Sequence, residues 1–248
     1  VYIPELHVGF VDATAPHACE PVNFAFNSDY VNLGRFCGPA DDPRIVQMTD
    51  KYRAMYKTAY AYLAAAGSAA KAEIPGLISA ETLEKVKKRA QSAALRELGG
   101  AGKKHCDAHE QRRFMRCISC KGELALAEDV QKLCKRIYLL DDRCGLADIY
   151  LKQMNAEAKE RGFGSILCLS PLCPDRLDAL LLPEPAVGFV SASAVNIAEP
   201  YRHVRLDALI QTETLQEARG ALKRRDKLVR ELTGEAVQWL ARAKEYHD

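Results

Sequence analysis

The chain has 248 residues, of which 48% are hydrophobic and 27% charged, with 35 Lys and Arg against 33 Asp and Glu. This composition is typical of a globular protein and excludes a disordered or fibrous one, and a net charge of +2 argues against a dedicated binder of nucleic acid or membrane surfaces. We expect a cytoplasmic protein, because no apolar run reaches the roughly 18 residues of a membrane span, no signal peptide begins the chain, and the nine cysteines follow no disulfide framework.

The first half begins with an apolar strand and continues with helices. The strand is predicted over residues 8–11, and a helix follows in which tyrosines recur every four residues from 52 to 60. Gly67 is expected to interrupt this helix. A second helix is predicted over residues 80–98, and Gly99 ends it as a left-handed cap would.

The second half alternates strands and helices. Strands are predicted at residues 136–140, 165–170 and 187–190, with a helix at 147–161 between the first two and a Pro-rich loop between the last two. A charged amphipathic helix over residues 206–246 ends the chain. Strand, helix, strand, loop, strand is the order of an α/β protein with a parallel sheet.

A repeated segment divides these elements into two copies of one fold. Residues 3–14, IPELHVGFVDAT, recur 179 residues later as residues 182–193, LPEPAVGFVSAS, with seven of the twelve positions identical. Such a match in register predicts a tandem duplication, with the first copy at residues 1–111 and the second at 112–248. Because the chain begins Val-Tyr-Ile-Pro and the strand–turn–helix of the second copy has no counterpart in the first, we expect the first copy to be truncated.

The turn after the strand at 136–140 stands where an α/β protein carries a phosphate loop. That loop needs the pattern G-x-x-x-x-G-K-[ST], in which backbone N–H groups and a lysine bind phosphate. Here Asp142, Ala147, Asp148 and Ile149 replace Gly, Gly, Lys and Ser/Thr, and only Gly145 remains as a candidate contact to a nucleotide. We therefore expect the second copy not to bind ATP tightly.

In the first copy, Asp12 follows the apolar strand directly. A carboxylate in this place can bind Mg²⁺ or its bound water, although many strands end in an Asp that serves only as a turn or cap residue. The second copy has Ser191 at the matching position, which cannot supply the charge. The second copy is thus predicted to be catalytically inactive towards nucleoside triphosphates.

Several segments resemble a bacterial family of tandem P-loop ATPase-like proteins. They are Ile3-Pro4-Glu5-Leu6, Asp12-Ala13-Thr14-Ala15-Pro16-His17 and Val31-Asn32-Leu33-Gly34-Arg35-Phe36 in the first half, and Arg136-Ile137-Tyr138-Leu139, Leu177-Asp178 and Leu182-Pro183-Glu184 in the second.

The resemblance implies a P-loop NTPase-like fold, with ATP and Mg²⁺ bound by the first copy of a parent protein. Carried over position by position, Asp12 and His17 become catalytic residues and Thr14 a neighbour of the nucleotide, while a loop-shaping role for Thr14 and His17 remains an equal alternative. The two copies would pack together as an intramolecular pseudo-dimer. The alternative is a non-enzymatic regulatory or interaction module.

A zinc site is the third possibility. Cys106 and His109 form a C-x2-H pair, and Cys117 and Cys120 form a C-x2-C pair, which are ligand types and spacings that tetrahedral Zn²⁺ accepts. The competing interpretation is a short strand at residues 113–118 that places its cysteines as small core residues.

Overall fold

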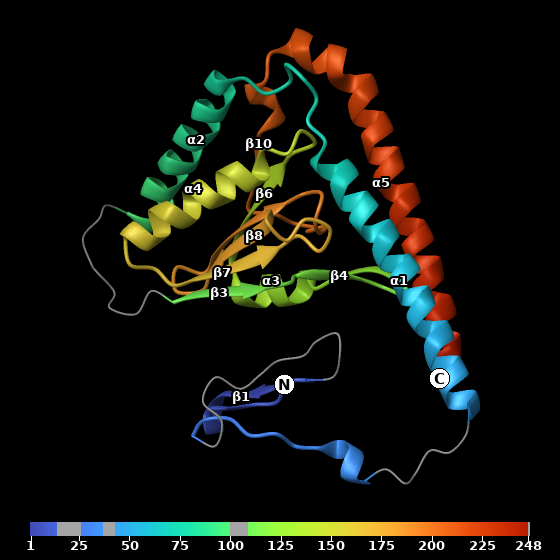
Figure 1. The fold of residues 1–248 in the computed structure, drawn as a ribbon. Coiled ribbons are helices and arrows are strands. Elements are labelled where there is room, and N and C mark those ends of the chain that lie inside the picture. The colour runs from blue at the N-terminus through green and yellow to red at the C-terminus, as the bar shows by residue number, and fades with distance from the viewer. Residues whose placement is uncertain (14–25, 37–42, 100–108, 248) are drawn as a thin grey trace. The chain divides into compact units, whose positions relative to one another are not determined.

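The computed structural model describes residues 1–13, 26–36, 43–99 and 109–247. It divides into two compact units, Val1–Val46 and Gln47–Asp248, whose elements are labelled in Figure 1.

The first unit contains a short hairpin. Strand β1 (Tyr2–Ile3) pairs antiparallel with β2 (Val8–Gly9) through the 3-10 turn η1 (Pro4–Leu6), and a second 3-10 turn, η2, spans Leu33–Phe36. The strand is shorter than the one predicted over residues 8–11. The apolar side chains in and next to this hairpin are exposed, with Tyr2 at 60% and Phe10 at 58%, because the described residues of the unit form no second layer against which the two strands could bury a face.

The second unit is α/β and is built on a six-stranded mixed sheet in the order β10-β6-β9-β8-β7-β3. The strands are β3 (Glu110–Arg113), β6 (Arg136–Asp141), β7 (Ser165–Leu169), β8 (Leu177–Leu182), β9 (Val187–Ser191) and β10 (Arg202–Arg205). Five strands run parallel, and β8 is antiparallel to both its neighbours. This mostly parallel sheet is compatible with a Rossmann-like or P-loop-like fold.

The predicted parallel sheet is confirmed for five strands, but the prediction overlooks the antiparallel strand β8. All six residues of β8 are buried, so the strand shows no alternation of apolar and polar residues. Only residues 183–186 separate β8 from β9, and a connection this short can join only antiparallel strands. The predicted boundary between the two copies, at residues 111 and 112, falls within β3.

Helices cover the sheet and extend beside it (Figure 1). Helices α2 (Ala80–Leu98) and α4 (Ala147–Glu160) pack together on one face, and α3 (Ala127–Leu133) covers part of the other. Both ends of α2 lie where the sequence predicts them. The Ser79 hydroxyl caps the first turn by accepting from the Thr82 N–H at 3.1 Å. Gly99 ends the helix with a φ of 74° and a ψ of −175°, so it has a positive φ but not the left-handed helical conformation predicted for the cap. A hairpin of β4 (Arg116–Ser119) and β5 (Gly122–Ala125) and the turn η3 (Asp207–Leu209) complete the unit.

Two long helices, α1 (Pro43–Lys71) and α5 (Thr212–His247), run antiparallel in Figure 1, and Lys51 Nζ lies 5.9 Å from the ring centroid of Tyr246. The predicted interruption of the first helix at Gly67 is wrong, since α1 continues through it. A Cβ at Gly67 would collide with the carbonyl oxygen of Leu172. The glycine therefore allows close packing rather than a break. No helix in the described ranges is long and apolar enough to cross a membrane.

The core lies on both faces of the sheet, because alternate side chains of each strand point to opposite sides. Tyr138 and Phe189 stack under α2 and α4 with ring centroids 4.9 Å apart. Ile137, Leu139 and Val190 pack on the opposite face with Val130 of α3. The carboxyl ends of β6, β7 and β9 are therefore held at one edge of a rigid sheet.

The β1–β2 hairpin and the turn between β8 and β9 have the same local geometry. Tyr2 faces Gly9 and Ile3 faces Val8 in the first, as Leu181 faces Gly188 and Leu182 faces Val187 in the second. His7 and Ala186, again 179 residues apart, both have a φ of 53°. They are the only non-glycine residues with positive φ in the part of the chain that the structure describes.

Candidate functional site

The carboxyl ends of the parallel strands border a pocket of about 450 Å³. In open α/β sheets this edge is where ligands bind. We call this pocket the strand-end pocket. The loop from β6 to α4, the residues after β7 and β9, the start of β8, the β4–β5 hairpin and α5 all contribute to its wall.

The loop between β6 and α4 folds around the side chain of Asp142. Its Oδ1 accepts hydrogen bonds from the backbone N–H groups of Cys144, Gly145 and Leu146 at 3.1, 2.8 and 2.9 Å, and its Oδ2 accepts from the N–H of Ala147 at 2.8 Å. Gly145 has a φ of 88°, which lets the loop curl so that these donors converge. Convergent N–H groups at a helix N-terminus form an anion-binding nest, and the chain's own carboxylate occupies this one.

Opposing effects act on the Asp142 carboxyl. Burial raises its pKa above the ordinary value for aspartate, and the nearby charge of Asp207 adds to this, while the N–H donors of the loop lower it. The carboxyl is thus shielded from water and held by the loop. A phosphate could enter the nest only by displacing it.

Asp148 takes the place of the lysine that a phosphate loop would have. Its Oδ2 accepts from Lys152 Nζ at 2.7 Å, and its Oδ1 accepts from the N–H of Leu177 at 2.9 Å. The side chain therefore fastens the first turn of α4 to the start of β8. It also adds negative charge where a polyphosphate would need a cation.

Ion pairs neutralise much of the remaining charge in the pocket. Arg116 donates from Nε to Asp178 Oδ2 at 2.7 Å and also contacts Glu123, and Arg143 lies 3.6 Å from a carboxylate oxygen of Asp226. The lining contains five arginines and five carboxylates. The pocket therefore has no net charge with which to attract a polyphosphate.

The residues predicted from the sequence are spread over both units. Gly145 lies in the nest with its N–H directed to Asp142. Asp12 is exposed and follows β2 in the first unit. Thr14 and His17 lie outside the described residues. The counterparts of Asp12 and Thr14 at the 179-residue offset, Ser191 and Ser193, both line the strand-end pocket, and their hydroxyls lie 2.9 Å apart.

Sequence reasoning missed two features of this site. It treated Asp142 only as a missing glycine, although an Asp two to five residues before a run of helix N-terminal N–H groups is a recognisable capping signal. It did not connect Arg116 with Asp178, because the two residues are 62 positions apart and no local pattern links them.

The candidate zinc ligands gain no geometric support. Cys117 is exposed on β4, Cys120 follows it in the hairpin turn, and His109 precedes β3. Cys106 lies outside the described residues. Among the residues whose positions are given, no group of three or more His, Cys, Asp or Glu side chains could hold a metal ion.

No protein-family model, curated protein or solved structure matches this chain.

Proposed function

We propose that the second copy, residues 112–248, is a P-loop NTPase-like module that has lost catalysis and acts as a regulatory or interaction half. In this proposal, ATP and Mg²⁺ bind the first copy of a parent protein, with Asp12 facing the metal or its water. The second copy contributes a rigid, non-catalytic partner domain in an intramolecular pseudo-dimer.

The Asp142 nest is the observation that carries the proposal. Its four N–H donors are those that would bind a phosphate in a working loop, and a carboxylate of the same chain satisfies all four. Since Asp148 stands in place of the lysine, the loop also lacks the cation that neutralises phosphate. Both changes act in the same direction, against nucleotide binding.

The matched hairpins support the tandem duplication. The same strand register and the same positive φ at His7 and Ala186 extend the similarity of the two segments from residue identities to backbone geometry. Under that duplication, Asp12 takes the position of Ser191, which lines the strand-end pocket. This supports a role for Asp12 beside a nucleotide in the first copy.

The proposal is tested by emptying the nest. Asp142→Ala removes the internal anion and leaves four N–H donors without an acceptor, so we expect inorganic phosphate or MgATP to bind the variant at least about tenfold more tightly than the unaltered chain. Isothermal titration calorimetry on the full chain measures both affinities.

Two further variants distinguish the effect of emptying the nest on affinity from the effect of removing a negative charge alone. Asp142→Asn keeps an oxygen acceptor in the nest and should gain much less affinity than Asp142→Ala. Glu123→Gln removes one negative charge from the same pocket without touching the loop and should leave the affinity unchanged. No gain in affinity for Asp142→Ala, or equal gains for Glu123→Gln and Asp142→Ala, would refute the proposal.

A further inference from the structure

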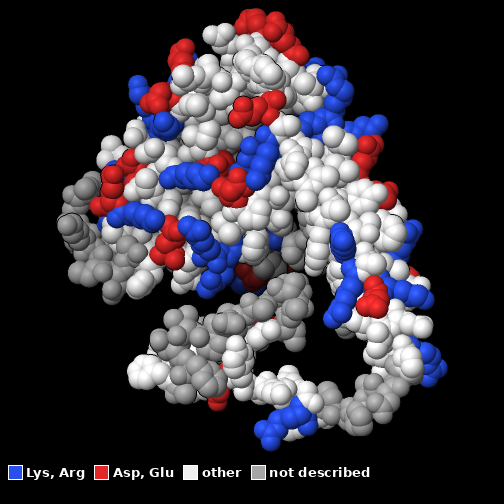
Figure 2. Space-filling view, in the orientation of Figure 1, with Lys and Arg blue, Asp and Glu red and all other residues white. Residues whose placement is uncertain are grey.

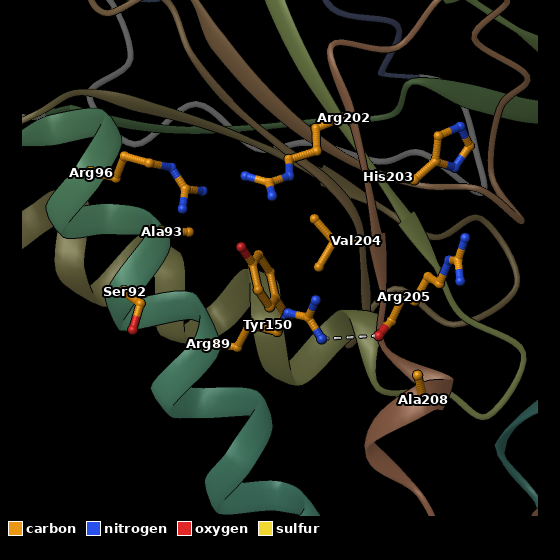
Figure 3. Close-up of a pocket in the computed structure, with 10 residues that line it drawn as sticks. All are labelled: Arg89, Ser92, Ala93, Arg96, Tyr150, Arg202, His203, Val204, Arg205 and Ala208. Atoms are coloured by element: carbon orange, nitrogen blue, oxygen red, sulfur yellow. Dashed lines mark hydrogen bonds between the residues drawn. The ribbon is translucent and has the colours of Figure 1, made fainter.

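A second groove, of about 400 Å³, lies between α2, α4 and the edge strand β10. It shares no lining residue with the strand-end pocket. Its lining residues, all shown in Figure 3, are Arg89, Ser92, Ala93, Arg96, Tyr150, Arg202, His203, Val204, Arg205 and Ala208. We call it the arginine groove.

The groove is rich in positive charge and has no carboxylate in its lining. Arg89 donates only to the carbonyl oxygen of Arg205, at 3.2 Å, and neither Arg202 nor Arg205 forms a salt bridge with any carboxylate in the described ranges. Arg96 pairs with Glu97 at 3.1 Å, but Glu97 also accepts from Tyr138 and lies near Arg136. Guanidinium groups gathered without counter-charges repel one another, so an anion bound among them is stabilised.

The carboxylate that contacts His203 does not neutralise the arginines of the groove. Its Nδ1 lies 3.0 Å from a carboxylate oxygen of Asp141, which is outside the groove lining. In Figure 3 the His203 ring and the Arg205 guanidinium point away from Tyr150. The side chains directed towards the centre are Arg89, Arg96 and Arg202.

Tyr150 forms the base of the groove. Its side chain is 1% exposed, and its hydroxyl points towards the guanidinium groups of Arg96 and Arg202 (Figure 3). No hydrogen-bond partner for this hydroxyl exists among the residues that the structure places. Burial raises the pKa of Tyr150 above the ordinary value for tyrosine, so the hydroxyl stays protonated at neutral pH. It can donate to an acceptor that enters the groove.

We propose that the arginine groove binds a small ligand that carries a diphosphate or polyphosphate group. Guanidinium groups donate paired hydrogen bonds to phosphate oxygens, and the Tyr150 hydroxyl adds one donor from below. Arg89, Arg96 and Arg202 come from α2 and β10, so they can surround a compact polyanion on two sides.

The groove suits a small molecule better than a nucleic acid. Its volume lies within the range of small-molecule pockets, about 300 to 1,000 Å³. A nucleic-acid surface would need basic residues along an extended face, whereas Figure 2 shows basic and acidic residues interspersed over the visible face of the second unit. The concentration of arginines without nearby carboxylates in the lining is therefore confined to this groove.

The test uses inorganic pyrophosphate as the probe and calorimetric titration of the full chain at low salt. The unaltered chain should bind it, and the double variant Arg89→Gln with Arg202→Gln should bind at least about tenfold more weakly, since two charged donors are removed. Tyr150→Phe, which removes only the hydroxyl, should weaken binding by roughly threefold to tenfold. Arg89 and Arg202 are both exposed, so the unfolding midpoint of the double variant should match that of the unaltered chain.

Matched variants locate the site. Arg219→Gln removes an exposed arginine of α5 outside both pockets and should leave the affinity for pyrophosphate unchanged. Failure of the unaltered chain to bind, or an equal loss with Arg219→Gln, would overturn the inference. Tighter binding of a short single-stranded RNA than of pyrophosphate, lost in the double variant, would also overturn it in favour of a nucleic-acid surface. The inference does not depend on the proposed loss of catalysis, because a different set of residues carries it.

Discussion

Arg116 links three elements at the rim of the strand-end pocket. It lies on β4, pairs with Asp178 on β8, and also contacts Glu123 on β5. The side chains of Arg116 and Asp178 are only 12% and 9% exposed. Breaking a buried pair by removing one partner leaves the other charge without compensation, so this pair holds the β4–β5 hairpin to the sheet.

We predict that Asp178→Ala lowers the free energy of unfolding by about 2 to 3 kcal/mol, near the lower end for a buried pair because Glu123 still compensates Arg116. Urea denaturation of the full chain measures the change. The control is Asp129→Ala, which breaks an exposed pair with Lys132 and should change stability by no more than about 1 kcal/mol. Equal effects of the two substitutions would show that the Arg116 pair has no special role.

At the scale of elements, local signals in the sequence predict helices better than strands. The bounds of α2 follow from its amphipathic pattern and its glycine stop, and the structure confirms both ends. The strand β8 could not be recognised, because a strand buried on both faces shows no alternation. The predicted helix break at Gly67 failed for a different reason. A glycine within a helical pattern predicts a break, but the role of Gly67 depends on its contact with Leu172, which is more than 100 positions away in the sequence.

Because α1 approaches the loop after β7 closely, we expect a Gly-to-Ala substitution in this helix to destabilise the protein, although such a substitution normally stabilises a helix. An Ala in place of Gly normally stabilises a helix by up to about 1 kcal/mol. At Gly67 the added methyl would collide with the Leu172 carbonyl oxygen, a backbone atom, so we expect Gly67→Ala to destabilise the fold by about 1 to 3 kcal/mol. Thermal or urea denaturation provides the measurement.

Gly234 is the matched control for Gly67. It lies within α5, and a Cβ built there meets no atom within 4 Å. Gly234→Ala should therefore stabilise the protein by about 0.5 to 1 kcal/mol, as in an open helix. If both substitutions stabilise, α1 does not pack on the Leu172 loop as closely as described.

At the scale of the whole molecule, the sequence predicts an α/β class and a loop that has lost its phosphate-binding residues, but not the arrangement of charge. The net charge of +2 predicts neither the balanced charges of the strand-end pocket nor the groove lined by four arginines. Those arginines stand at positions 89, 96, 202 and 205. Only the packing of α2 against the sheet edge brings them together, so no sequence window could reveal the groove.

The two matching hairpins lie in different surroundings. The β1–β2 hairpin repeats the geometry of the turn between β8 and β9, yet the surroundings differ. Phe189 and Val190 are fully buried, while their counterparts Phe10 and Val11 are 58% and 75% exposed. Since no further strand pairs with the β1–β2 hairpin in the part of the chain that the structure describes, the hairpin gains little from burial.

We therefore predict that removing residues 1–46 leaves the denaturation midpoint of the remaining chain unchanged, because the sheet, its covering helices and both hydrophobic clusters lie within Gln47–Asp248. The same deletion should reduce binding of an apolar dye, since it removes the exposed Tyr2, Phe10 and Val11. Removing residues 1–79 is the control. That deletion also takes away α1, whose Lys71 lies 2.6 Å from a carboxylate oxygen of Asp175 and whose Gly67 packs on Leu172, so it should lower the midpoint. A clear loss of stability on removing residues 1–46 alone would mean that the hairpin contributes to the fold of the second unit.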